Sequence, residues 1–103
     1  MQDLSRTVFH DGPRGDVTQR NIWWSMLLTR LLMNNEDLRR EFPKECTVML
    51  LPEGDDELVH HNLKLYRLAK SERPVILVNI GVHDAVVDIQ SLNAGPRREY
   101  ALG

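Results

Sequence analysis

Residues 74–80, which read Pro-Val-Ile-Leu-Val-Asn-Ile, decide the fold because they form the strongest strand pattern in the chain. The run is nearly continuous in apolar and β-branched residues, which is typical of a strand covered on both faces. We expect Gly81 to end this strand. Residues 85–89 predict a further strand, antiparallel to the first, after the short link 82–84.

The residues before this strand predict a strand–helix–strand unit. Cys46–Leu51 is a short apolar run followed by the turn residues 52–54, and it indicates a buried strand. A helix should begin after Asp55 or Asp56, whose carboxylates suit a helix N-terminus, and continue to about Lys70. Two strands joined in this way are expected to be parallel, with a right-handed crossover.

The helix that precedes this unit is unusually apolar. Nine of the twelve residues from Ile22 to Met33 are apolar, whereas a surface helix in a small domain needs only one apolar stripe. The helix should begin near Asp16 or Thr18, because Asp16 and Gln19 have the spacing of a capping box. We expect it to pack both on its own sheet and on a second protein.

On a helical wheel these apolar residues divide into two groups. Ile22, Met26 and Met33 form a narrow stripe, and the other group covers about half of the circumference. We predict that the broad face forms the interface with a second copy or another protein. Its residues are Trp23, Trp24, Leu27, Leu28, Leu31 and Leu32.

Asn62 is the most informative polar residue of the second long helix. It falls near the centre of an apolar face that includes Leu58, Leu65 and Tyr66, whereas His60 points away. A buried amide without partners costs about 1–3 kcal/mol. Asn62 is therefore predicted either to make a structural hydrogen bond to nearby backbone or to act as a ligand or interface contact.

Polar residues also follow the two parallel strands. Glu53 and Asp55 come after the first strand, and His83 and Asp84 come after the second. Ligands of open α/β sheets favour the carboxyl ends of the strands, and carboxylates with an imidazole can hold a divalent metal. Helix capping and a solvated turn explain the same residues. We expect no metal and no cofactor, and keep the four residues as candidates at the ligand edge.

The composition excludes several other classes. The net charge of −2 and the pI of about 6.0 give no basic field for nucleic acid, although a few arginines could form a local patch. The single cysteine, Cys46, excludes an internal disulfide. The apolar core of this helix, Ile22–Met33, is shorter than the roughly 20 residues of a membrane span, and Arg30 interrupts it. No signal peptide is visible, so we expect a cytoplasmic protein. The basic residues that could form this local patch are Arg39, Arg40, Lys44, Arg97 and Arg98.

These elements predict a small two-layer α/β domain: an apolar N-terminal helix, a β-α-β unit and a third, antiparallel strand. Residues 18–92 should form the single domain, with a flexible arm at 1–17 and a loose tail at 93–103. A core of this size usually needs additional stabilisation, and oligomerisation, most simply a homodimer, is the form available here.

Short segments distributed over residues 21–81 carry a resemblance to a small prokaryotic family of unknown function. The resemblance implies the same order of elements, including a Leu-Pro-acidic turn, a helix with Asn-Leu and a Pro-Val strand. The chain departs from it by a longer N-terminal arm and by Asn34-Asn35 in place of a His-Pro-like break. No catalytic residue is implied. The segments are Val48, Leu51-Pro52-Glu53, Asp55, Glu57-Leu58, Asn62-Leu63, Leu65, Pro74-Val75, Val78 and Ile80-Gly81.

The function that the sequence favours is a non-enzymatic interaction module. It would dimerise or dock a protein partner through the helix 22–33. The alternative is a small metal-dependent enzyme or ligand-binding domain that uses the carboxyl-end edge of the strands, with Glu53, Asp55, His83 and Asp84 as its candidates.

Overall fold

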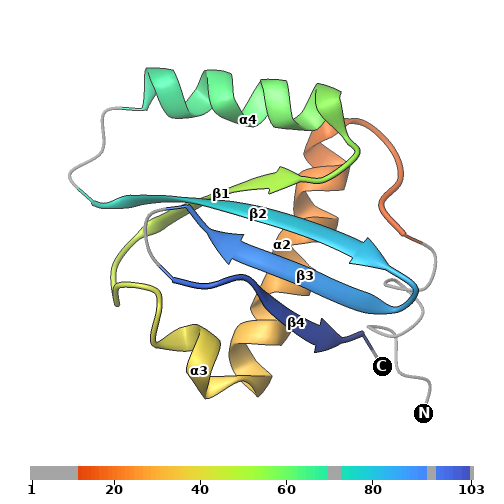
Figure 1. The fold of residues 1–103 in the computed structure, drawn as a ribbon. Coiled ribbons are helices and arrows are strands. Elements are labelled where there is room, and N and C mark those ends of the chain that lie inside the picture. Colours follow the sequence, from red (N-terminus) through yellow and green to blue (C-terminus); the bar gives the residue numbers. More distant parts are fainter. Residues whose placement is uncertain (1–11, 70–72, 93–94, 103) are drawn as a thin grey trace, which may run out of the picture.

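The computed structural model describes residues 12–69, 73–92 and 95–102, so most of the predicted N-terminal arm lies outside the described residues. It confirms the α/β class: helices pack on a mixed four-stranded sheet with the order β1-β2-β3-β4 (Figure 1). The elements are α2 Val17–Asn34, α3 Glu36–Arg39, β1 Thr47–Pro52, α4 Asp56–Leu68, β2 Val75–His83, β3 Val86–Ser91 and β4 Arg98–Ala101.

The strand pairing follows the prediction, but one strand is longer than expected. β1 and β2 are parallel, and β2 and β3 are antiparallel. Gly81 does not end β2, which continues to His83. The hairpin then turns through Asp84 and Ala85, whose φ angles of 49° and 61° are those of a two-residue turn between twisted strands. The extra residues let β2 pair with β3 as far as Val86.

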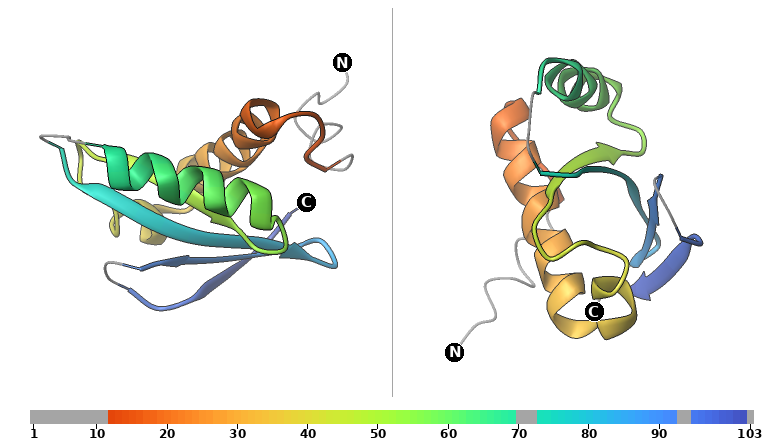
Figure 2. Two further views of the ribbon diagram at one scale, coloured as in Figure 1. Left: turned by 90° about the horizontal axis from the view of Figure 1, so that it is seen from above. Right: turned by 90° about the vertical axis from the view of Figure 1, so that its left-hand side faces the viewer.

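In the part of the chain that the structure describes, helices lie on only one face of the sheet, so the expectation of a strand covered on both faces is wrong. Ile76, Val78 and Ile80 are buried in the core, whereas Asn79 is exposed and Leu77 is half-buried on the other face. α2 runs behind the sheet, and α4 lies along its β1 edge (Figures 1 and 2). Apolar residues on both sides of β2 made its pattern resemble that of a fully covered strand.

α2 begins with the predicted capping box. The Asp16 carboxylate accepts a hydrogen bond from the Gln19 backbone N–H at 2.9 Å, and the Gln19 side chain accepts one from the Asp16 N–H at 2.9 Å. This reciprocal pair satisfies two N–H groups that have no partner within the helix. The helix ends at Asn34, where the sequence predicts a break.

The broad apolar face of α2 packs on the chain's own sheet, which corrects the predicted interface. Leu32 is half-buried against the same core, which also contains sheet residues such as Val78. The two tryptophan rings meet edge to face, with centroids 4.7 Å apart. The other five predicted interface residues are all buried: Trp23, Trp24, Leu27, Leu28 and Leu31.

Part of the predicted loose tail is a strand. β4 pairs antiparallel with β3. Its Arg98 guanidinium contacts Glu41 and Asp37 at 2.8 Å each, and the Tyr100 hydroxyl donates to Asp37 at 3.0 Å. These contacts join β4 to α3 and to the residues just after it. Tyr100 and Leu102 also pack against the core.

Candidate functional site

The narrow stripe of α2 and the outer side of α4 both expose apolar side chains. Ile22 is 54% exposed, Met26 43% and Met33 71%, and Leu65 on α4 is 45% exposed. Together with Thr29 these residues line a groove of about 860 Å³ between the two helices. We call this surface the α2–α4 groove.

The position of α4 explains why this surface is open. Leu58 and Asn62 are the buried residues of α4, and Val59 is half-buried. The predicted apolar face is therefore wrong for Leu65 and Tyr66, which are exposed. Because α4 lies along the β1 edge, the sheet covers only a narrow strip of the helix.

Thr29, a polar residue of the groove, has a hydrogen-bond partner within its own helix. The Thr29 hydroxyl donates to the Ser25 backbone carbonyl at 2.8 Å. Burial of Thr29 would therefore leave no hydrogen-bond donor without a partner at this hydroxyl. Arg30 and His61 also line the groove. Among the described residues, no carboxylate does so.

Asn62 lies below this surface and is buried. Its amide N–H donates to the Leu50 backbone carbonyl at 2.8 Å, and its side chain exchanges two hydrogen bonds of 2.8 Å with Asn21. The contacts with β1 and α2 match the structural reading of Asn62. The sequence pattern did not single out Asn21. Because Asn21 lines the α2–α4 groove, the Asn21–Asn62 pair lies next to that groove.

The structure brings together two of the four residues proposed at the ligand edge. His83 Nε2 and Glu53 Oε2 are 3.1 Å apart. Asp55 instead caps α4 through the Leu58 N–H and pairs with Arg20 at 2.9 Å. Asp84 lies in the hairpin turn. Within residues 12–69, 73–92 and 95–102, no three metal-ligating side chains converge.

The contacts of Arg20 join α2 to the start of α4 and have a structural role. Besides Asp55, its guanidinium contacts Glu57 and donates to the Gly15 carbonyl at 2.8 Å. The hydrogen bond to Glu57 is the main cause that raises the pKa of Arg20 above its ordinary value. The hydrogen bonds given for Asp55 are therefore to Arg20 and to the N-terminus of α4.

The open sheet face has a polar hollow of about 380 Å³, which Asn79, Gln90 and Arg97 help to line. Arg97 pairs with Asp88 at 2.9 Å, and this hydrogen bond is the main cause that lowers the pKa of Asp88. On the other side of the sheet, Arg98 is paired with acids of α3 and its end.

Two further arginines of the suggested basic patch, Arg39 and Arg40, also make local contacts. Arg40 pairs with Glu36 at 3.0 Å. The Arg39 guanidinium donates to the Met33 backbone carbonyl at 3.4 Å. The suggested basic patch is thus divided among local contacts on several elements.

The comparisons with known proteins concern the family and not a reaction. No helix in the described part of the chain is long and apolar enough to cross a membrane. No curated protein and no solved structure matches the chain. A family model does match residues 16–91, from the N-cap of α2 to the last residue of β3. The chain therefore belongs to the family of unknown function DUF5647.

Proposed function

We propose that this protein is an interaction module that forms a homodimer through the α2–α4 groove. The observation that carries the proposal is the exposed stripe of Ile22, Met26 and Met33 on a helix whose broad face is already used by the protomer's own core. Contiguous exposed apolar surface of this kind marks interaction sites in soluble domains. Two methionines in the stripe can adapt their side chains to a partner surface.

The spacing of the stripe indicates that its partner is a helix. Ile22, Met26, Thr29 and Met33 are separated by four, three and four residues. Apolar residues that repeat about every 3.5 positions form the seam of two packed helices. Thr29 fits such a seam because its hydroxyl is already bonded to Ser25, which leaves its methyl group for packing.

A second copy of α2 satisfies this seam by itself. In an antiparallel pair about a two-fold axis between Met26 and Thr29, Ile22 faces the partner's Met33 and Met26 faces the partner's Thr29. The same pairing separates the two Arg30 side chains along the seam, because each is opposite the partner's Ser25. No carboxylate among the described residues lines the groove, so burial would desolvate no acid there.

Sedimentation velocity of wild type, Met26→Asp and Leu92→Asp tests the proposal. Leu92 is a matched control because it is 50% exposed and directly follows β3, outside the groove. We expect a dimer for wild type and Leu92→Asp. Met26→Asp should be a folded monomer, since two carboxylates would enter the seam. A wild-type monomer at about 50 μM, or a dimer that survives Met26→Asp, contradicts the proposal.

A further inference from the structure

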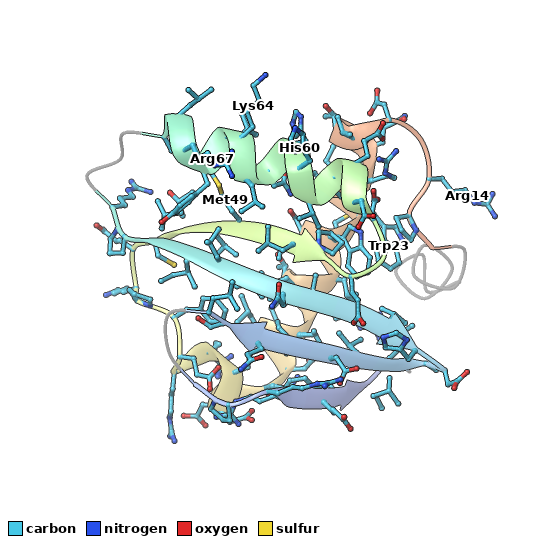
Figure 3. All side chains as sticks on the ribbon, turned by 45° about the horizontal axis from the view of Figure 1, so that its top comes forward. Arg14, Trp23, Met49, His60, Lys64 and Arg67 are labelled. Carbon is cyan, nitrogen blue, oxygen red and sulfur yellow. The ribbon has the colours of Figure 1, made fainter. Side chains whose placement is uncertain are left out.

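We infer that a hollow between α2 and the carboxyl ends of β1 and β2 binds a small neutral carboxamide, whose carbonyl accepts a hydrogen bond from Trp24. We call this space the tryptophan hollow. It measures about 400 Å³ and lies at the edge that ligands of open α/β sheets favour. Figure 3 shows Trp23 at this place, beside the end of β1. The described residues that line the hollow include Trp23, Trp24, Glu53, Val82, Ala85 and Leu102.

The tryptophan hollow is separate from the α2–α4 groove. No described residue lines both, although α2 contributes to each of them. The inference therefore does not depend on the proposed homodimer, and the failure of one would leave the other intact.

The indole N–H of Trp24 is the observation that points to a ligand. Trp24 is only 5% exposed, and it packs edge to face on Trp23 within the core. Within residues 12–69, 73–92 and 95–102, its Nε1 is the only buried side-chain nitrogen or oxygen without a hydrogen-bond partner. A buried tryptophan N–H usually has a partner, because a donor without one lowers the stability of the fold. An acceptor supplied by a ligand in the hollow that Trp24 lines would satisfy this group.

The size and the lining of the hollow suit an organic molecule better than water. One water takes about 30 Å³ of the liquid, so a single water would leave most of the hollow empty. A cluster of waters needs several polar partners, whereas Trp23, Val82 and Leu102 are apolar. Ligand sites usually measure about 300–1,000 Å³ and have a mainly apolar lining with a few polar groups. The tryptophan hollow therefore suits a compact ligand with one ring or a short alkyl group.

Glu53 determines which acceptor the hollow prefers. The Glu53 backbone N–H donates to the Ile80 carbonyl at 2.7 Å, which holds the residue beside β2. Its Oε2 atom is 3.1 Å from His83 Nε2, and its other carboxylate oxygen makes no hydrogen bond with the described residues. An anionic ligand would be repelled by this carboxylate. A neutral carboxamide instead offers its carbonyl to the indole N–H and its own N–H to the available oxygen of Glu53.

NMR of the indole N–H groups tests the inference with benzamide as the probe. The chain has two tryptophans, so Trp23→Phe and Trp24→Phe assign the two indole signals. We expect the Trp24 signal to shift and to saturate with a dissociation constant of about 1 mM or lower, an ordinary affinity for a molecule of about nine non-hydrogen atoms. Benzoate has the same ring but a negative charge, so it should bind at least about tenfold more weakly.

Three variants test whether benzamide occupies the tryptophan hollow. Trp24→Phe keeps an aromatic ring but lacks the N–H, so the dissociation constant, followed on the Val82 backbone amide, should rise about three- to tenfold. Trp23→Phe is the matched control, because it loses the same ring area and keeps the Trp24 N–H. It should weaken binding less than Trp24→Phe does. Val82→Phe fills the hollow and should prevent the shift of the Trp24 signal. Circular dichroism checks that each variant is folded.

Four results would overturn the inference. The first is a Trp24 signal that does not move with benzamide up to about 20 mM. The second is equal affinity for benzamide and benzoate, which would mean that Glu53 does not select a neutral ligand. The third is an affinity that Trp24→Phe or Val82→Phe leaves unchanged, because benzamide would then bind elsewhere. The fourth is a magnetisation-transfer signal between water and the Trp24 N–H that benzamide does not alter, which would assign a bound water to this donor.

Discussion

At the scale of single residues, Ala85 carries a conformational cost that no hydrophobic pattern shows. Its φ of 61° lies in the left-handed region. There the Cβ atom lies too close to the following carbonyl oxygen, which costs about 1–2 kcal/mol. Ala85→Gly removes this strain. Glycine also raises the conformational entropy of the unfolded chain, which lowers the stability by about 0.4–1 kcal/mol. We expect a net stabilisation of about 0.5–1 kcal/mol in denaturant melts. Ala85→Val should destabilise the protein. A Val variant that is more stable than the Gly variant would mean that the turn changes its conformation.

Asn62 provides a second test at this scale. Asn62→Ala would leave the Leu50 carbonyl and the Asn21 amide without their partner inside the fold. We expect a loss of about 1–3 kcal/mol in the free energy of unfolding. The matched variant His60→Ala should cost less than about 0.5 kcal/mol, because His60 is exposed. Equal urea midpoints for the two variants would contradict a structural role for the amide pair.

The sequence could predict the position of Asn62 but not its partners. A helical wheel identifies an amide on an apolar face, because that depends only on neighbours within the helix. Asn21 lies 41 residues earlier, and Arg20 lies 35 residues before Asp55. Such pairs depend on how α2 crosses α4, which local spacing does not contain.

At the scale of elements, α2 shows what an apolar pattern leaves undecided. The wheel separates a broad face from a narrow stripe, but it does not say which of them the chain's own sheet covers. The sheet takes the broad face, since burying more apolar area is more favourable. The excess apolar surface inferred from the sequence does exist, but it lies on Ile22, Met26 and Met33.

This assignment predicts a severe effect for Leu28→Asp. Leu28 is buried between α2 and the sheet, so the variant places a carboxylate in the core. We expect the free energy of unfolding to fall by at least about 3 kcal/mol, or the chain not to fold. Thermal melts followed by circular dichroism measure this. An unchanged melting temperature would show that the broad face of α2 is not in the core.

β4 could not be predicted from its own residues. Arg-Glu-Tyr-Ala has little apolar character, and it is held by Asp37 and Glu41, which lie 57–63 residues earlier. The hydrogen bond from Tyr100 is the main cause that lowers the pKa of Asp37. Asp37 therefore contributes stability above the carboxyl pKa of the unfolded chain, and loses it as the pH falls through the lower folded value.

Tyr100→Phe tests this link between β4 and α3. Without the hydroxyl, the pKa of Asp37 should rise toward its ordinary value, and the acid loss of its contribution should move to higher pH. An NMR titration of the Asp37 carboxyl carbon measures the shift. The Asp88 carboxyl, which pairs with Arg97, serves as an internal control. A titration of Asp37 that is unchanged in the variant would contradict the contact.

At the scale of the whole molecule, the order and directions of the first three strands were predictable, whereas the uncovered face of the sheet was not. A helix between β1 and β2 requires a parallel pair, and the short link after β2 requires an antiparallel one. A second helical layer would need a further helix on the other face of the sheet, and the described residues contain none there. Asn79 in the middle of β2, with Asp88 and Gln90 on the neighbouring strand, is a polar residue on that uncovered face.

The proposed homodimer makes the stability of the whole molecule depend on concentration. If unfolding also separates the chains, each tenfold increase in concentration stabilises the native dimer by about 1.4 kcal/mol. Spread over two chains of this size, this corresponds to a rise of about 3–5 °C in the melting temperature. Calorimetry of wild type from about 5 to 500 μM should show this rise. Met26→Asp should melt at one temperature throughout, because its chains fold singly. A wild-type melting temperature that is constant over this range would mean that folding is complete within one chain and that the exposed stripe of α2 has no second copy on it.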